Sequence, residues 1–359
     1  MISNYLPGGS KIGVGYWVDQ FASELVRRGH TVTVFSTCPP GRAVSYETVV
    51  IKIPGRGRTF RFAAHVRRLD LSGYDVLHAH GDDYLCWRRR APVHVRTMHG
   101  SCFHEALRIK GTLERLRMFL LGCGELVSSV LADRTFVVSP NTRKWMPWVQ
   151  DVLPAGVDLG RFARPPRLAR EPVPTILFVG TYRQRKRGSL LVDLFQRKIR
   201  PALPNAELWM VSEDCPPSEG VLPLGRLSDE ELVSRYHRAW VFCLPSTYEG
   251  LGIPYIEAMA AGLPVVASPN PGAKYVLEEG RAGLISPDDE LASQLLRLLT
   301  SRKERERLTK QGQARASSFN LSVVTDTYED AYYALGRLRA RQPMGFVRRW
   351  PDDSYVELG

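Results

Sequence analysis

The chain has 359 residues, of which 44% are hydrophobic and 24% are charged. This length exceeds what one ordinary core fills and suits two α/β domains of ordinary size. No run of about 18 uninterrupted apolar residues occurs, so a membrane-spanning helix is not expected. The first residues lack the basic and apolar regions of a secretory signal, and we therefore expect a cytoplasmic protein.

The net charge of +12 is distributed unevenly. Residues 1–165 hold 23 Lys and Arg against 13 Asp and Glu (23 − 13 = +10), whereas the remainder holds 26 against 24 (26 − 24 = +2). Such asymmetry indicates an anionic partner for the first half: a phosphorylated substrate, an acidic membrane surface or nucleic acid. An arginine-rich composition without such a partner is the alternative. Six cysteines show neither C-x-x-C pairing nor metal-ligand spacing and are expected to be reduced thiols.

Strands and helices alternate along both halves of the chain. A helix is expected over 16–29, where apolar residues recur on one face. Short β-branched runs predict strands, and strands separated by helices favour parallel βαβ units. The predicted strands are 31–37, 74–80, 93–99 and 134–140 in the first half, and 175–181, 207–213, 240–246 and 264–270 in the second.

The proline-rich segment 162–174 is the best candidate for a linker. It predicts an N-terminal acceptor-binding domain over 1–165 and a C-terminal nucleotide-sugar-binding domain over 166–340, followed by a tail over 341–359. The last helix is a candidate for a return to the first domain. Each half has the pattern of a doubly wound sheet, and two such halves facing across a cleft would place a ligand between them. A first strand before the glycine-rich start is either very short or lies upstream of Met1.

The segment 246–268, STYEGLGIPYIEAMAAGLPVVAS, carries the clearest chemistry. Glu249 and Glu257 flank a GLGIP turn that opens a helix, and Pro254 suits the first helical turn. The free amides at such a helix start attract a phosphate. One carboxylate on each side of the phosphate could contact the hydroxyls of a ribose and of a sugar.

This Glu-x7-Glu block followed by EAMAAGLPVVAS resembles the family 4 retaining glycosyltransferases of the two-Rossmann, or GT-B, fold. GVGYWVDQFASELVRRGHTVTVFS, DVLHAH, TMHGS and VLPAGVDLGRF are similar to further segments of that family, so the resemblance covers most of the chain. It implies a metal-independent hexosyltransferase that needs no cofactor and takes its sugar from a nucleotide-diphosphate donor. The resemblance implies His99 and Glu249 as catalytic residues. The implied donor-binding residues are Gly13, Gly15, Lys186, Arg187, Gly225, Arg226, Leu251, Gly252, Ile253 and Glu257.

The segment FVGTYRQRKRG, residues 178–188, is similar to the phosphate-binding loop of that family. Thr181 stands where the family has an Arg, and Arg187 stands at the position of its Lys. A cation at Arg187 can still stabilise the departing diphosphate. Arg183 or Arg185 is a candidate replacement for the missing Arg, with solvated side chains as the alternative.

Two features of the first half bear on the acceptor. His80, Asp82 and Asp83 end a predicted strand and could bind acceptor hydroxyls or amines, with a solvated loop as the alternative. The segment 104–131 mixes apolar and basic residues, as interfacial helices do, but ordinary helix packing is favoured.

Together these features predict a retaining glycosyltransferase that uses a UDP-sugar in preference to a GDP-sugar and a small-molecule or glycoside acceptor. For retention, the leaving phosphate would take the acceptor proton, so no enzymic nucleophile is needed. The alternatives are a peripheral-membrane enzyme acting on a lipid such as a phosphoinositide, and a nucleotide-sugar epimerase of similar fold. A nucleic-acid partner is not expected, because no interleaved basic and aromatic patch occurs.

Overall fold

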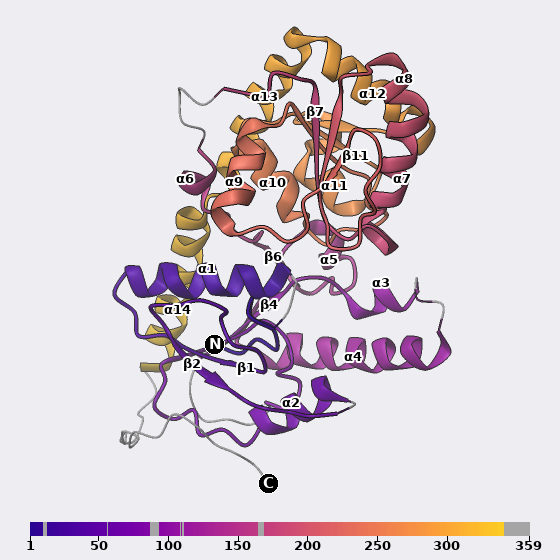
Figure 1. The fold of residues 1–359 in the computed structure, drawn as a ribbon. Coiled ribbons are helices and arrows are strands. Elements are labelled where there is room, and N and C mark those ends of the chain that lie inside the picture. Colours follow the sequence, from indigo (N-terminus) through magenta and orange to yellow (C-terminus); the bar gives the residue numbers. More distant parts are fainter. Residues whose placement is uncertain are drawn as a thin grey trace. The chain divides into compact units, whose positions relative to one another are not determined.

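The computed structural model describes residues 1–9, 13–55, 57–86, 93–107, 109, 111–163 and 169–340. Two compact units emerge: the first combines Met1–Gly156 with the chain from Leu321 onward, and the second is Val157–Asn320. Figure 1 shows both. The division thus falls at Gly156 and Val157 instead of at 165/166. Helix α14 (Leu321–Ala340) clusters with the first unit. The predicted tail, 341–359, lies outside the described residues.

The first unit is an α/β structure. Besides α14, its helices are α1 (Gly13–Arg27), α2 (Arg58–Val66), α3 (Cys102–Ala106), α4 (Thr112–Leu131) and α5 (Pro140–Arg143). Its strands are β1 (Thr33–Ser36), β2 (Glu47–Val50), β3 (Val76–Ala79), β4 (Val93–Met98), β5 (Arg134–Val137) and β6 (Asp151–Val152).

The N-terminal residues join the two groups of parallel strands in the first unit. β2 pairs with β1, and β3, β4, β5 and β6 pair in that order. Ile2 forms parallel bridges to both Phe35 of β1 and Ala79 of β3, and it is completely buried. The amide of Ile2 donates to the carbonyl of His78, and the amide of Ser3 donates to that of Phe35. Residues 1–3 therefore act as a very short strand between β1 and β3. The other strands lie outward from it on both sides, β2 beyond β1 and β4, β5 and β6 beyond β3.

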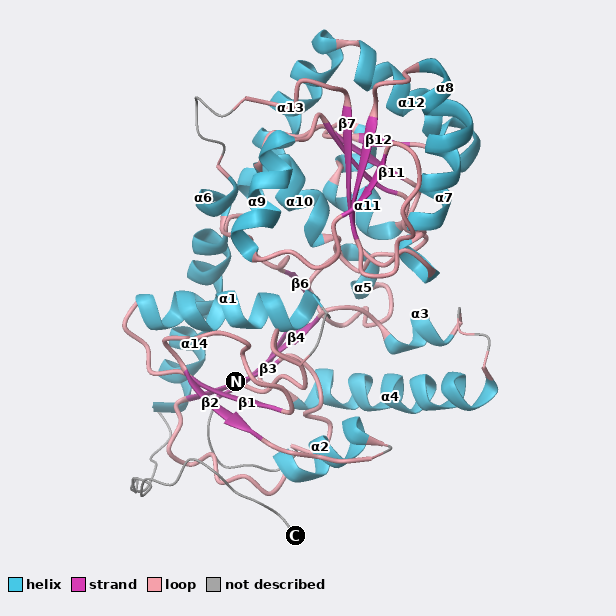
Figure 2. Cartoon of the chain, in the orientation of Figure 1, coloured by secondary structure: helices cyan, strands magenta, loops and turns pink. Residues whose placement is uncertain are grey.

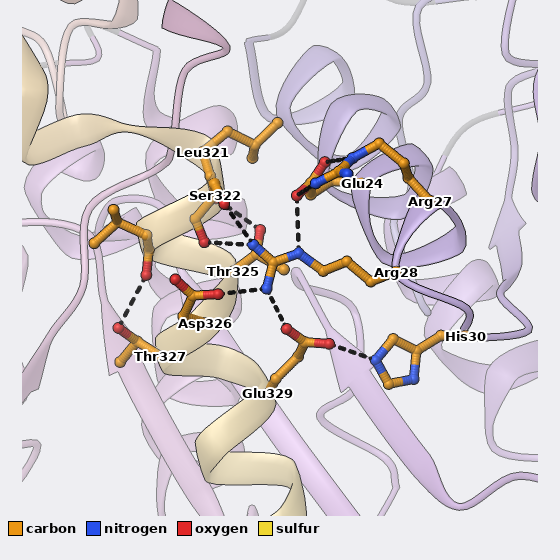
Figure 3. A network of polar contacts seen from close by, with 11 residues as sticks. Glu24, Arg27, Arg28, His30, Leu321, Ser322, Thr325, Asp326, Thr327 and Glu329 are labelled. Atoms are coloured by element: carbon orange, nitrogen blue, oxygen red, sulfur yellow. Dashed lines mark hydrogen bonds and ion pairs between the residues drawn. The ribbon is translucent and has the colours of Figure 1, made fainter.

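Helix α14 is held against α1 by a network around Arg28 (Figure 3). The guanidinium of Arg28 contacts Asp326 at 2.5 Å and also pairs with Glu329. It donates a further hydrogen bond to the carbonyl of Ser322 at 2.8 Å. His30 lies 2.6 Å from the second oxygen of Glu329. These charge-assisted contacts join residues about 300 positions apart and fix α14 within the first unit.

The second unit is a second α/β structure, with helices on both sides of its sheet in Figure 2. Its strands are β7 (Thr175–Val179), β8 (Glu207–Val211), β9 (Val221–Pro223), β10 (Val241–Leu244), β11 (Val265–Ala267) and β12 (Leu284–Ile285). Its α-helices are α6 (Leu159–Phe162), α7 (Gly188–Leu194), α8 (Arg200–Ala202), α9 (Asp229–Arg238), α10 (Ile253–Ala260), α11 (Pro271–Val276), α12 (Asp288–Thr300) and α13 (Arg302–Ala316). Short 3-10 turns η1 (Gln184–Lys186), η3 (Glu278–Gly280) and η4 (Ser317–Phe319) and a π-helical turn η2 (Phe195–Ile199) complete it.

The sheet of the second unit has six parallel strands in the order β12-β11-β10-β7-β8-β9. The first strand in sequence, β7, therefore lies between β8 and β10, and successive strands are added outward in both directions. In such a sheet the loops after the two central strands diverge and leave a crevice at the carboxyl ends of the strands. The crevice belongs to the loops that follow β7 and β10, and these are the predicted phosphate loop and the GLGIP turn.

All eight predicted strands occur, each shorter than its predicted segment. Ser228 caps α9 through a capping box with Glu231. The amphipathic segment 104–131 is not one helix, because α3 and α4 are separate. All six cysteines are free thiols.

Candidate active site

The GLGIP turn connects β10 to α10 through a left-handed residue. Gly252 has φ 92° and is the residue before α10, and a Cβ there would lie 2.5 Å from the ring of Tyr255. Only glycine satisfies both requirements at low cost. The amides of Leu251, Gly252 and Ile253 precede the first amide that can bond within the helix, so they form the helix start that attracts an anion.

The start of α11 packs directly against this turn. A Cβ on Gly272 would lie 2.7 Å from the Cβ of Glu249 and from the carbonyl oxygen of Leu251. Asn270 caps α11, and its amide nitrogen donates to the carbonyl oxygens of Ser246 and Ser268. Asn270 is buried with its hydrogen bonds satisfied, and it therefore fixes the start of α11 against the turn. Neither Asn270 nor Gly272 was predicted, although both lie in the PN-PG run after β11.

Glu249 is buried between two cations from the loop after β7. Lys186 Nζ lies 2.6 Å from Glu249 Oε1, and Arg185 Nη1 lies 3.0 Å from Oε2. Burial alone would raise the pKa of Glu249, but Lys186 and Arg185 hold it below the usual range of a glutamate. The carboxylate is therefore ionised and engaged on both oxygens. This arrangement joins the two predicted loops into one cluster.

Arg187 does not face this cluster. It adopts a left-handed backbone with φ 54°, and its guanidinium pairs with Asp288 at 2.6 Å. The same group donates to Ser268 Oγ at 2.9 Å and to the carbonyl of Pro245 at 2.6 Å. These contacts hold the Arg187 side chain away from Glu249, and its role at the diphosphate stays a prediction. Lys186 and Arg185 are the cations at the carboxylate.

Glu257 lies one turn into α10 and is half-buried. The hydroxyl of Tyr236, on α9, donates to its Oε2 at 2.9 Å. Burial raises the pKa of Glu257, and the Tyr236 hydrogen bond partly offsets this. The second oxygen, Oε1, has no hydrogen-bond partner among the described residues, so a ligand hydroxyl could bind it. The role of Tyr236 had no signal in the sequence, since it depends on the packing of α9 against α10.

The remaining predicted donor residues of the second unit lie on loops. Gly225 has φ 62° with nothing near its Cβ position, and Arg226 is exposed. Both follow β9 and are open to a ligand. Thr181 Oγ1 donates to the carbonyl of Arg183 at 3.0 Å, which shapes the loop after β7. No contact of Arg183 with the Glu249 cluster is present in the described structure, so Arg185 is the better replacement for the missing Arg.

In the first unit, His80 and His99 end neighbouring strands and meet. His80 Nδ1 lies 3.2 Å from His99 Nε2. The indole of Trp17, on α1, lies against both rings at 5.0 and 5.3 Å between centroids. Burial lowers the pKa of His80 well below its usual value and lowers that of His99 to about 3. Both imidazoles are therefore neutral near pH 7, one donating to the other.

A second layer beneath these rings comes from α14. Tyr332 Oη lies 2.5 Å from His78 Nδ1, and His78 Nε2 lies 2.8 Å from Thr97 Oγ1. Tyr328 Oη bonds the same threonine at 2.9 Å. His78 and His80 are 4.2 Å apart between ring centroids. The C-terminal helix thus supports the predicted catalytic histidine, which sequence reasoning missed because the tyrosines lie more than 200 residues from the strands.

The two aspartates predicted to contact the acceptor differ. The side chain of Asp83 is completely buried in an ion pair with Arg96 of β4 and lies 2.9 Å from His94 Nε2. These partners engage the Asp83 carboxylate inside the unit, so its contacts give no support to an acceptor role, which stays a prediction. Asp82 has φ 62° and accepts from Tyr84 Oη at 2.6 Å. Burial raises the pKa of Asp82 to about 6.

The glycines of the predicted loop in the first unit have different surroundings. Gly13 is exposed and begins α1. Gly15 is buried, and a Cβ there would lie 3.0 Å from the carbonyl oxygen of Tyr5. Gly15 therefore lets α1 approach its own preceding segment. Residues 10–12 of the loop lie outside the described part of the chain.

Two family models together match residues 12–315. "Glycosyltransferase Family 4" matches residues 12–161, and "Glycosyl transferases group 1" matches residues 161–315. The chain belongs to the family 4, group 1 glycosyltransferases. Their GT-B fold is also that of sucrose-phosphate synthase from Thermosynechococcus elongatus, with a TM-score of 0.74 at 21% identity, covering 94% of this chain and 98% of that one.

Two relatives of this glycosyltransferase have names that state the transferred sugar and the acceptor. A phosphatidyl-myo-inositol mannosyltransferase of Mycobacterium tuberculosis is 28% identical over 355 residues, which covers 89% of this chain and 92% of the relative. A GDP-mannose-dependent α-(1-6)-phosphatidylinositol monomannoside mannosyltransferase of the same species is 30% identical over 183 residues, covering 42% of this chain and 47% of that one. In the part of the glycosyltransferase that the structure describes, no helix is long and apolar enough to cross a membrane.

Proposed function

We propose that this glycosyltransferase moves a mannosyl residue from GDP-mannose to an inositol phospholipid. The observation that supports a nucleotide-diphosphate donor is the cluster of Lys186, Arg185 and Glu249 beside the start of α10, at the crevice of the second sheet. The names of the two relatives support the choice of mannose, of GDP and of a lipid acceptor. A UDP-sugar with a small-molecule acceptor, favoured by the sequence, is the competing assignment.

The donor is proposed to bind with its diphosphate at the amides of Leu251, Gly252 and Ile253. A helix start stabilises a phosphate through unpaired amides and the helix dipole. Arg185 and Lys186 add positive charge on the same side, and Glu257 accepts from the ribose hydroxyls. Gly225 and Arg226 remain the proposed contacts of the base. Gly13 remains a proposed contact of the diphosphate through its backbone.

Transfer is proposed to proceed with retention and without a metal ion. The bond from the anomeric carbon to the diphosphate oxygen breaks, and the acceptor oxygen forms the new bond on the same face. The acceptor proton passes to the departing diphosphate. Glu249 is a poor nucleophile here because Lys186 and Arg185 bind both of its oxygens. We therefore assign it to orienting the sugar and the two cations, which stabilise the developing charge.

His99 is proposed to contact the sugar as a neutral hydrogen-bonding group. Its lowered pKa, about 3, keeps it uncharged near pH 7, so it would not repel the oxocarbenium-like sugar in the transition state. Asp82 is the stronger candidate for an acceptor hydroxyl, since Asp83 pairs with Arg96.

Peripheral contact with an anionic membrane belongs to the same proposal. The excess of ten positive charges in residues 1–165 (23 − 13) suits a negatively charged lipid surface. Such attraction weakens as salt screens it. Flotation with phosphatidylinositol-containing vesicles in low and high salt tests this contact.

The donor is tested by thermal shift and calorimetry with GDP, GDP-mannose, UDP and UDP-glucose. Binding to the folded protein raises its unfolding temperature by mass action. GDP-mannose should bind most tightly. Selective binding of a uridine nucleotide would restore the sequence-based assignment and overturn the choice of GDP.

The acceptor is tested with radiolabelled GDP-mannose and phosphatidylinositol in mixed micelles, with and without EDTA. A labelled lipid of α configuration should form at an unchanged rate in EDTA. Inversion at the anomeric carbon would contradict retention, and loss of activity in EDTA would contradict metal independence. Conversion of the donor to an isomer without any acceptor would indicate an epimerase instead.

Two substitutions test the assigned residues. Glu257→Ala should weaken donor binding by about 10- to 100-fold, the range expected when a charged hydrogen bond is lost. His99→Ala should lower kcat while leaving the donor Kd within a few-fold. Unchanged transfer kinetics in both variants would contradict the site.

A further inference from the structure

Helix α4 of the first unit leaves a long apolar face uncovered. One side of the helix is buried on the unit, with Met118, Leu121, Gly122, Ser128 and Ser129 inside. The opposite side exposes large apolar residues, from Leu113 at 81% to Val130 at 68%. The exposed stripe consists of Leu113, Leu116, Leu120, Cys123, Val127 and Val130.

The positions of this stripe follow a heptad pattern. They are separated by three, four, three, four and three residues, which is the spacing of the a and d positions in a coiled coil. Phe119 and Leu131 widen the stripe at its flanks, where they are also exposed. A seam of this spacing matches the surface of a second helix along its whole length. Half-exposed apolar residues in such numbers on one helix indicate an interface.

The charges on α4 favour a helix over an anionic membrane as the occupant. Its four charged residues are Glu114, Arg115, Arg117 and Glu125, so they sum to 2 − 2 = 0. Arg117 pairs with Glu114 on the same helix. Residues 122–131 contain no basic side chain, whereas a helix lying on an anionic lipid surface has Lys and Arg along its polar face.

The stripe is complementary to itself when two copies run antiparallel. Its spacing reads the same from either end, so Leu113 faces Val130, Leu116 faces Val127, and Leu120 faces Cys123 of the other copy. A two-fold axis between residues 121 and 122 relates the two helices, as in an isologous dimer. The antiparallel direction also keeps the charged ends of the two helices apart and aligns their dipoles favourably.

We propose that α4 pairs with α4 of a second copy of this chain, and that the glycosyltransferase is a dimer through this seam. The proposal does not depend on the donor or the acceptor. The same readout therefore stands whether or not the proposed function is correct.

The first experiment compares sedimentation equilibrium of the full chain with that of two variants. Leu120→Glu places a charge at the centre of the seam and should weaken dimerisation at least about tenfold. Leu120 is 52% exposed, so the fold of the monomer should tolerate the change. Val323→Glu, on α14, is the matched control because Val323 is 55% exposed and lies outside the seam. It should leave the dimer intact.

The second experiment uses Cys123 as a built-in probe. It is exposed, whereas the other five cysteines are buried or half-buried. A short bismaleimide should link two chains covalently, and Cys123→Ser should abolish the link. A chain that remains monomeric at tens of micromolar overturns the proposal, as does a dimer that survives Leu120→Glu. Flotation of a monomeric protein with anionic vesicles, lost in Leu120→Glu, would assign the face to a membrane and also overturn it.

Discussion

Lys186 and Arg187 are adjacent in sequence and have different partners. Lys186 binds Glu249 at 2.6 Å, while Arg187 binds Asp288 at the same distance. The sequence alone could not separate them, since either cation suited the phosphate loop. Arg187 has a left-handed backbone, and its side chain pairs with Asp288 at the start of α12 instead of with the Glu249 carboxylate.

Replacing each cation should separate the two roles. Lys186→Met removes one partner of a buried carboxylate and should lower kcat by at least about tenfold, because it withdraws charge from the diphosphate. Arg187→Met breaks a partly exposed pair with Asp288 and should chiefly lower the unfolding free energy, by about 1 kcal/mol. Steady-state kinetics and urea denaturation of both variants make the comparison. A larger kinetic loss in Arg187→Met would return the diphosphate to Arg187.

His80 is expected to act through His99. The 3.2 Å contact orients the His99 ring and sets which of its nitrogens carries the proton. His80→Phe keeps the aromatic packing on Trp17 but removes the hydrogen bond, so kcat should fall about tenfold with an unchanged donor Kd. His65→Phe, a half-buried histidine on α2, is the control. Equal kcat in the two variants would show that His80 has no positioning role.

At the scale of elements, most strands were predictable, whereas β2, β6, β9 and β12 were not predicted. Short β-branched runs mark a buried parallel strand wherever it occurs, so β3, β4, β7 and β10 stood out. The two-residue strands β6 and β12 are too short for a sequence pattern to develop. The role of residues 1–3 depends on partners at Phe35 and Ala79, which no local signal reveals.

The turn before α10 depends on Gly252. Gly252→Ala would strain a left-handed backbone and push a methyl group against Tyr255, so stability should fall by about 1–3 kcal/mol and donor binding should weaken. Gly29→Ala is a matched control, because Gly29 has φ 97° and nothing within 4 Å of its Cβ position. Denaturation and calorimetry on the two variants separate backbone strain from steric conflict. Equal stability losses would show that the Tyr255 contact does not matter.

At the scale of the whole molecule, the neutral histidines predict acid sensitivity. Burial lowers the pKa of His78, His80 and His99 below the value of about 6.5 in an unfolded chain. Their contribution to stability is therefore complete above pH 6.5 and is lost as the pH falls below it. For His99, with a pKa of about 3, the loss at pH 5 is at most about 2 kcal/mol.

Asp82 opposes this trend. Its pKa of about 6 lies above that of an unfolded aspartate, so its protonated form favours folding and its contribution is lost as the pH rises through 6. Asp82→Asn should therefore stabilise the protein at pH 7.5 and make the decline toward pH 5 steeper. Urea denaturation at both pH values measures this. An unfolding free energy of the parent protein that is equal at pH 7.5 and pH 5 would contradict the neutral-histidine assignment.

Because α14 belongs to the first unit, it determines which of the two units can finish folding first during synthesis. Residues 157–320 form a contiguous unit and can fold as soon as they have left the ribosome, whereas the first unit must wait for Tyr328 and Tyr332. A product cut short before residue 328 would keep the proposed nucleotide-binding loops but leave Thr97 and His78 without their tyrosine partners. Nascent chains would therefore complete the proposed nucleotide-binding loops before His78 and Thr97 of the first unit gain their contacts with α14.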